Sequence, residues 1–228
     1  MKKIILIIFF IISISYLFSN PLTEFVSYMN ENGSIKFDLD TKIHVKDIES
    51  DSSTLTYIDE EIRLNFFMSD WKNFFCKFES PDILSGISFV YLSDEAILFS
   101  LVNDIPWRQY RIDSNIELIL NILNNFLWEL FNEAFYTSEE VVSDGVTTYI
   151  FTPSKAKSAL NNLFSGGYLP DYMYFKIELS TENIPILKEI TISEKSQIEY
   201  IKLKFSNLQF SSEKDYFEKM KELYYDTF

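Results

Sequence analysis

The feature that most constrains the fold is a series of short segments in which apolar and polar residues alternate. Alternation with a period of two indicates β-strands that bury one face. Only a few turn-forming residues join consecutive segments, and parallel neighbours would need long crossovers, so the pattern predicts an antiparallel meander. Strands are expected at residues 42–48, 58–68, 71–78, 87–92, 96–102, 107–112, 146–152, 172–179, 186–193 and 198–205.

Other segments have the spacing of amphipathic helices. Leu22, Phe25 and Met29 lie on one side of a short helix that ends at Asn32 and Gly33. A wider apolar stripe follows a capping box formed by Ser114 and Glu117, and its width predicts a helix that covers an apolar sheet surface. Helices are expected at residues 22–30, 116–135, 155–164 and 212–224.

The N-terminus has the three parts of a secretory signal. Lys2 and Lys3 precede an apolar run from Ile4, and small residues follow it. Cleavage fits before Tyr16 or before Asn20, and we expect a signal peptide over residues 1–19 followed by one domain over residues 20–228. An uncleaved anchor is the alternative, although the run is shorter than the ~20 residues that span a bilayer. The expected location is the periplasm, with membrane attachment if the signal stays uncleaved.

The charge of the chain excludes some classes of partner. The formal net charge is −14, and removal of Lys2 and Lys3 with the signal leaves 18 basic against 34 acidic residues, which is −16. Such a chain is repelled by nucleic acid, and no basic stripe is visible in the sequence. We therefore expect no nucleic-acid partner.

Residues with catalytic chemistry are sparse. Cys76 is the only cysteine, which rules out an internal disulfide and favours a small buried apolar side chain. His44 is the only histidine and lies on the polar side of a predicted strand, as expected for a surface residue. Acidic pairs such as Glu139 and Glu140 arise by chance among 34 acids. We expect neither an enzyme nor a cofactor or metal.

Two stretches resemble the LolA-type outer-membrane lipoprotein carrier and lipoprotein-sorting superfamily. Residues 74–89 are similar to that family's strand, its turn with Pro81, Leu84 and Gly86, and the strand that follows. Residues 184–208 are similar to its late hairpin, which starts at a proline and ends in the pattern of Phe205 and Asn207. No arginine of this chain can be matched to the functional arginine of the family.

The resemblance implies an α+β fold with a curved antiparallel sheet, an incomplete β-barrel covered by helices. It also implies an apolar cavity that binds the acyl chains of a lipid or lipoprotein, which agrees with the 22 Phe and 14 Tyr of the chain. We expect a monomeric carrier with inner- or outer-membrane proteins as further partners. The residues expected to line the cavity are Phe66, Phe74, Phe78, Phe89, Phe99, Leu101, Phe126 and Leu130.

Two other functions fit the same sequence. An envelope sensor or protein-interaction module could use the same half-barrel to bind a protein partner. A hydrolase could use carboxylates, and it would lose turnover when a single Asp or Glu is replaced.

Overall fold

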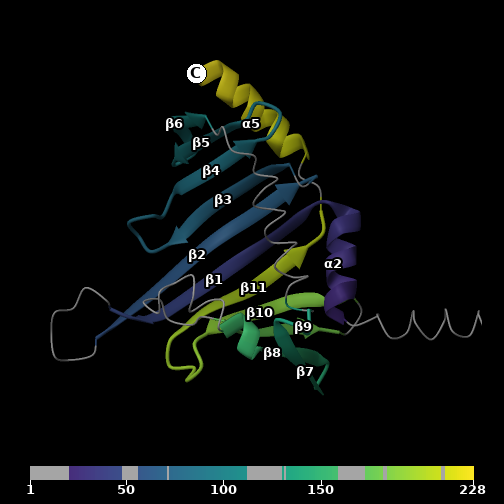
Figure 1. Cartoon of the computed structure of the whole chain (residues 1–228). Helices are drawn as coiled ribbons and strands as arrows, with labels where there is room; N and C mark the ends of the chain where they lie inside the picture. Colours follow the sequence, from purple (N-terminus) through teal and green to yellow (C-terminus); the bar gives the residue numbers. More distant parts are fainter. Residues whose placement is uncertain are drawn as a thin grey trace, which may run out of the picture.

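The computed structural model describes residues 21–47, 56–70, 72–111, 130, 132–158, 173–181, 184–211 and 214–228. They form one antiparallel sheet of eleven strands in the order β6-β5-β4-β3-β2-β1-β11-β10-β9-β8-β7 (Figure 1). The strands are β1 (Ile35–Lys46), β2 (Tyr57–Ser69), β3 (Asn73–Ser80), β4 (Ile87–Leu92), β5 (Ile97–Val102), β6 (Ile105–Arg111), β7 (Tyr136–Ser143), β8 (Val146–Pro153), β9 (Tyr174–Ser180), β10 (Ile186–Ser193) and β11 (Tyr200–Gln209). The longer helices of the described residues are α2 (Pro21–Asn32) and α5 (Lys214–Thr227).

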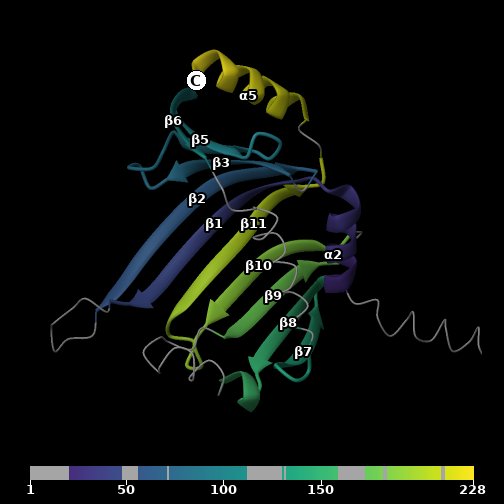
Figure 2. The same cartoon turned by 45° about the horizontal axis from the view of Figure 1, so that its top comes forward.

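The sheet consists of two meanders joined at one seam. Strands β1 to β6 follow one another in space, as do β7 to β11, and β1 pairs with β11 to join the two sets. The sheet is strongly twisted and open, with β6 and β7 as its edges (Figure 2). The antiparallel meander expected from the short connections is therefore confirmed, and the curved sheet does not close into a barrel.

The first helix packs on one face of the sheet. Pro21 stands at its first position, where a missing N–H costs nothing, and the Gly33 N–H bonds to the Met29 carbonyl at its end. Its apolar side buries Leu22 and Phe25 against Phe151 and other side chains of β8 to β10. We call this side of the sheet the α2 face.

The last helix packs on the opposite face. Phe217 of α5 is buried against Phe67, Phe75 and Phe99 at the β2 to β5 end of the sheet. Side chains that pair across antiparallel strands share a face, and Phe67 pairs with Phe75 while Phe66 pairs with Cys76. The side that carries Phe67 is the α5 face, so the two helices cover different faces at different ends (Figure 1).

The structure confirms most of the predicted elements and changes some boundaries. β1 begins at Ile35, seven residues before the predicted strand, and α2 and α5 match the predicted helices. β7 was not predicted, because every residue after Tyr136 is exposed and no alternation appears. Ala134 and Phe135 lie in a turn, so the helix predicted to Phe135 ends earlier.

Several predictions fall outside the described residues. These include the signal peptide in residues 1–19 and most of the helix predicted at 116–135, of which only Leu130 is described as helical. Of the helix predicted at 155–164, residues 155–158 are described and are helical. Among the described residues, no helix is both long and apolar enough to cross a bilayer.

Candidate functional site

A continuous row of aromatic rings crosses the middle of the α2 face. We call it the aromatic row, and its members, in order across β11, β1, β2, β3 and β4, are Phe205, Phe37, Phe66, Phe74 and Tyr91. Successive ring centroids are 5.2, 5.0, 6.1 and 5.5 Å apart, which is the distance range of favourable aromatic contact. The register places each ring opposite or diagonal to the next, so the row follows directly from strand pairing.

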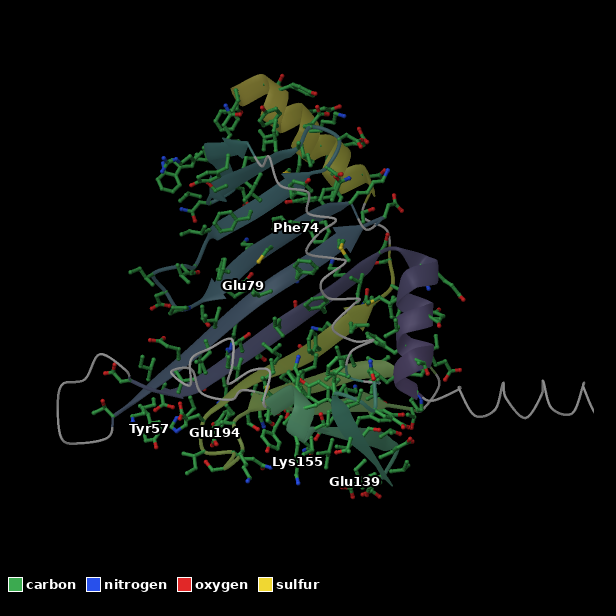
Figure 3. The ribbon with its side chains drawn as sticks, viewed as in Figure 1. Tyr57, Phe74, Glu79, Glu139, Lys155 and Glu194 are labelled. Carbon is green, nitrogen blue, oxygen red and sulfur yellow. The ribbon has the colours of Figure 1, made fainter. Side chains whose placement is uncertain are left out.

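The centre of this row is only half-buried. Phe37, Phe66 and Phe74 each have intermediate exposure, and none of them belongs to the buried cluster under α2 or to the one under α5. No described helix therefore packs on them. Large rings left partly exposed side by side on a sheet mark a surface suited to an apolar ligand. The sheet around the labelled Phe74 is shown with its side chains in Figure 3.

Four of the eight residues predicted to line a cavity lie together on the α2 face. Phe66 and Phe74 are in the aromatic row. Phe78 and Phe89 form a second aromatic pair beside it, with centroids 6.3 Å apart. The shared face of these four side chains follows from the alternation that the sequence shows.

The other four predicted residues are not brought to this place. Phe99 and Leu101 are buried on the α5 face in the cluster with Phe217, so they do not share a surface with Phe66. Leu130 is fully buried against α2 and strands β8 to β10, at one end of the α2 face. Phe126 lies outside the described residues.

The row is completed by Phe37, Phe205 and Tyr91, which are not among the eight residues predicted to line a cavity. Tyr91 lies on the same side of its strand as Phe89, and Phe205 ends a predicted strand. The signal for Phe37 was present too, because Ile35, Phe37 and Leu39 alternate with charged residues. What the sequence lacked was the pairing of β1 with β11, which brings Phe37 and Phe205 together.

Cys76 lies beside the row on the same face, between Phe66 on β2 and Phe89 on β4. It is half-buried rather than fully buried, and burial raises the pKa of its thiol to about 11. The thiol is therefore protonated at neutral pH and acts as a small apolar group instead of a nucleophile.

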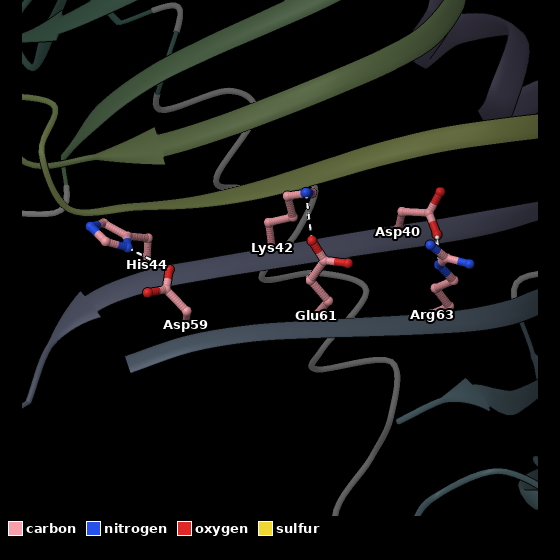
Figure 4. A network of polar contacts seen from close by, with 6 residues as sticks. All are labelled: Asp40, Lys42, His44, Asp59, Glu61 and Arg63. Atoms are coloured by element: carbon pink, nitrogen blue, oxygen red, sulfur yellow. Dashed lines mark hydrogen bonds and ion pairs between the residues drawn. The ribbon is translucent and has the colours of Figure 1, made fainter. Parts of the chain in front are cut away.

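The α5 face is polar where α5 does not cover it. Three polar contacts join β1 to β2 in a ladder: a hydrogen bond between His44 Nδ1 and Asp59 at 2.6 Å, and ion pairs of Lys42 with Glu61 at 2.5 Å and of Arg63 with Asp40 at 3.1 Å (Figure 4). The hydrogen bond to Glu61 raises the pKa of Lys42, and the same bond lowers the pKa of Glu61. Pairs this exposed contribute little to stability but fix which side chains stand next to one another.

His44 occupies the polar side of its strand, as predicted, but it is not a simple surface residue. Its ring is stacked between Tyr57 and Tyr200, with centroids at 4.7 and 5.5 Å. Among the described residues, no group of three or more potential ligands could hold a metal ion.

Three hollows adjoin one another along the α5 face. One of about 560 Å³ lies over Asp38, Asp40, Arg63 and Lys77, and one of about 160 Å³ shares Asp40 and Arg63 with it. A third of about 590 Å³ lies over β8 to β11 and shares Lys202 with the second. None of the eight predicted cavity residues lines any of them.

No protein-family model matches the sequence, and comparison with curated proteins found no match. Among solved structures, the chain is similar to an uncharacterized conserved protein from Thermus thermophilus, with 10% identity over 85% of this chain and 89% of that one, at a TM-score of 0.44. It is also similar to a LolA superfamily protein from Nitrosomonas europaea, with 7% identity over 82% and 93% of the two chains and a TM-score of 0.31.

A third similar structure is described as an outer membrane lipoprotein-sorting protein domain from Vibrio parahaemolyticus. It is 10% identical over 88% of this chain and 99% of that chain, with a TM-score of 0.31. The superfamily that the sequence motifs resemble is thus present among the structural neighbours.

Proposed function

We propose that this protein is a periplasmic carrier that binds the acyl chains of a lipid or lipoprotein on the α2 face, without covalent chemistry. The observation that supports the proposal is the aromatic row, whose central rings Phe37, Phe66 and Phe74 are half-buried and lie outside both core clusters. The finer fold that goes with it is the half-barrel of the LolA-type carriers, with α2 covering one end of the binding face.

The dimensions of the row suit an extended hydrocarbon chain. Neighbouring strands lie about 4.8 Å apart, so a row across five strands is about 19 Å long. Each methylene removed from water contributes about 0.8 kcal/mol, so a dozen of them give on the order of 10 kcal/mol before ordering costs are subtracted. Hydrophobic burial is therefore the largest favourable contribution to binding on this face, and the cost of ordering the ligand reduces the net affinity.

The side chains around the row suit binding more than catalysis. Leu39 and Leu64 pair beside Phe37 and Phe66 on the same face, and the neighbouring Cys76 thiol is held protonated by its raised pKa. An acyl chain would meet aliphatic and aromatic groups along this path, which favour transfer from water without reacting.

The test is titration with a fluorescent fatty acid of the wild type and of Phe66→Ala, with Phe228→Ala as the matched control. Phe228 is an exposed phenylalanine just after α5, where its ring centroid lies 5.6 Å from that of Tyr224, far from the row. Loss of a ring in direct contact with the ligand should weaken binding about tenfold or more, while the control should match the wild type.

Native mass spectrometry of protein purified from its host supplies the second measurement. A bound lipid in the wild type supports the proposal. Failure of the wild type to bind the fatty acid, together with an unliganded native mass, would refute it. Recovery of one stoichiometric protein partner without lipid would favour the interaction module instead.

A further inference from the structure

The α5 face carries two adjacent cross-strand rows with different chemistry. The antiparallel register places four residues of neighbouring strands side by side on this face. We call them the tyrosine row, and they are Tyr174, Ser193, Tyr200 and His44. A second row lies two residues further along or back on each strand. We call it the lysine row, and its members are Lys176, Thr191, Lys202 and Lys42. Rings thus stand next to ammonium groups and hydroxyls over β9, β10 and β11.

The members of these rows on β9, β10 and β11 form the floor of the hollow of about 590 Å³. Its lining residues are Ile150, Thr152, Tyr174, Phe175, Lys176, Thr191, Ser193, Lys195, Gln197, Tyr200 and Lys202. Three of them are lysines and none is Asp or Glu, in a chain with a net charge of −14. A concave site that gathers lysines and has no carboxylate in its own lining offers ammonium donors for charge-assisted hydrogen bonds to an anion.

The carboxylates nearest the hollow are engaged with its lysines. Glu178 and Glu189 pair with Lys176 and Lys202, at 2.5 and 3.1 Å, from the next row along the strands. An ammonium has three donors, so each lysine keeps hydrogen-bonding capacity after one such pair. Lys195 is exposed at the rim, and no described residue forms an ion pair with it.

Glu194 is kept out of the hollow by its own turn. Its carboxylate accepts hydrogen bonds from the Ser196 N–H at 2.6 Å and the Ile198 N–H at 2.9 Å, and another from the Ser196 hydroxyl. The same turn carries Lys195 and Gln197 to the rim of the hollow. Figure 3 shows Glu194 in this turn at the end of the sheet.

The aromatic part of the hollow is held in position. Tyr200 lines it and stacks on His44, which in turn stacks on Tyr57 and bonds to Asp59 at 2.6 Å. A fixed ring presents a flat, electron-rich face to the C–H groups of a ligand. The same hollow is also lined by Thr152, Thr191 and Ser193, which carry hydroxyls, and by Gln197, which carries an amide.

We propose that this hollow binds a sugar that carries a phosphate or carboxylate group. The lysines bind the anion, Tyr174 and Tyr200 contact the sugar ring, and the hydroxyls and the Gln197 amide bond to the sugar hydroxyls. The site lies on the face opposite the aromatic row, so it stands independently of acyl binding and can be occupied at the same time.

Isothermal titration of the intact protein with glucose 6-phosphate, glucuronate, glucose and inorganic phosphate tests the proposal. We expect both anionic sugars to bind, the neutral sugar about tenfold more weakly or not at all, and inorganic phosphate more weakly than the sugar phosphate. Whichever of the two anionic sugars binds with the higher affinity identifies its phosphate or carboxylate as the preferred anionic group. Raising the salt concentration should weaken binding because it screens the lysines.

The variants are Lys202→Gln and Tyr200→Ala, with Lys219→Gln on the exposed side of α5 as the control of equal charge change. Lys202→Gln should reduce affinity for the anionic sugars about tenfold, and Tyr200→Ala should reduce affinity for the sugar phosphate but not for inorganic phosphate. Circular dichroism checks that each variant is folded. Absence of binding by all four compounds, equal affinity for glucose and glucose 6-phosphate, or equal loss in the Lys219→Gln control would overturn the proposal.

Discussion

Phe66 and Phe67 are neighbours on β2, and they belong to opposite faces of the sheet. Phe66 stacks on Phe37 with centroids 5.0 Å apart in the aromatic row, whereas Phe67 contacts Phe217 of α5 at 5.2 Å. Phe67 is 6% exposed, while Phe66 has intermediate exposure. One peptide bond therefore separates a ring of the stable core from a ring of the proposed binding face.

These two positions should respond differently to the same substitution. Phe67→Ala opens a cavity under α5 and should lower the free energy of unfolding by about 3–5 kcal/mol. Phe66→Ala removes a half-buried ring and should cost only about 1–2 kcal/mol while weakening fatty-acid binding. Urea unfolding and fluorescence titration measure both effects. Equal stability losses with unchanged binding in both variants would contradict the division of faces.

Cys76 should report on occupation of the α2 face. Because its pKa is about 11 against an ordinary 9.0, its thiolate fraction at pH 8 is about a hundredfold lower, and alkylation should be slow and accelerate until about pH 11. Oleate should slow alkylation further by covering the thiol. The urea-unfolded chain gives the uninhibited rate, and Phe66→Ala should lose the oleate effect. Equal rates with and without oleate in the wild type would place the lipid elsewhere.

Gly86 should tolerate alanine less well than Gly145 does. Both have positive φ, 82° and 74°, so both variants incur the left-handed backbone cost of about 1–2 kcal/mol. Only at Gly86 would an added Cβ lie 2.5 Å from Asn103 Oδ1, in the turn where the Asn103 N–H bonds to the Gly86 carbonyl. The Asn103 side-chain amide must move aside to admit the Cβ, so thermal unfolding should rank wild type above Gly145→Ala and Gly145→Ala slightly above Gly86→Ala. The reverse order of the two variants would exclude this contact as a constraint.

Glu194 should stabilise the β10–β11 turn in a pH-dependent way. Partial burial pushes its pKa upward, but hydrogen bonds from Ser196, Ile198 and Glu199 outweigh burial and hold the pKa below the usual 4.5. A lowered folded pKa gives stability that is complete above pH 4.5 and is lost as the pH falls through the lower folded value.

Replacing Glu194 by Gln should therefore cost about 0.5–1 kcal/mol at pH 7, a figure reduced for solvent screening, and the difference from wild type should shrink below about pH 4.5. Ser196→Ala keeps the carboxylate and removes the hydroxyl donor, so it should show a smaller effect of the same sign. Chemical unfolding between about pH 3 and pH 7 measures both. A difference that grows as the pH falls would reverse the assigned direction.

The sequence predicted those elements whose periodicity is unbroken. A strand was predicted at residues 87–92, and the observed β4 has these same bounds. β7 was not predicted because it is an edge strand that is exposed along nearly all its length, so its sequence shows no alternation of apolar and polar residues. Its acidic residues, Glu139 (Figure 3) and the neighbouring Glu140, are typical of edges that avoid pairing with other chains.

The candidate site was predicted only in part, because alternation along a strand is a local property and the pairing of strands is not. Alternation within one strand correctly grouped Phe74, Cys76 and Phe78, because their order along a pleated strand determines their side. It could not relate one strand to another, and so Phe99 and Leu101 were predicted beside Phe66 although they lie on the opposite face. A shift of one residue in register exchanges the two faces, and only the paired sheet fixes that register.

The sequence by itself therefore determined that the chain forms antiparallel strands with α2 and α5 as amphipathic helices, since periodicity and short connections are local properties. The tertiary structure decided which face each helix covers and which rings meet. The pairing of β1 with β11 spans most of the chain, and it creates both the aromatic row through Phe37 and Phe205 and the stacking of His44 on Tyr200. Contacts between residues so distant in the chain leave no local pattern, because they arise from register and from the burial of whole faces.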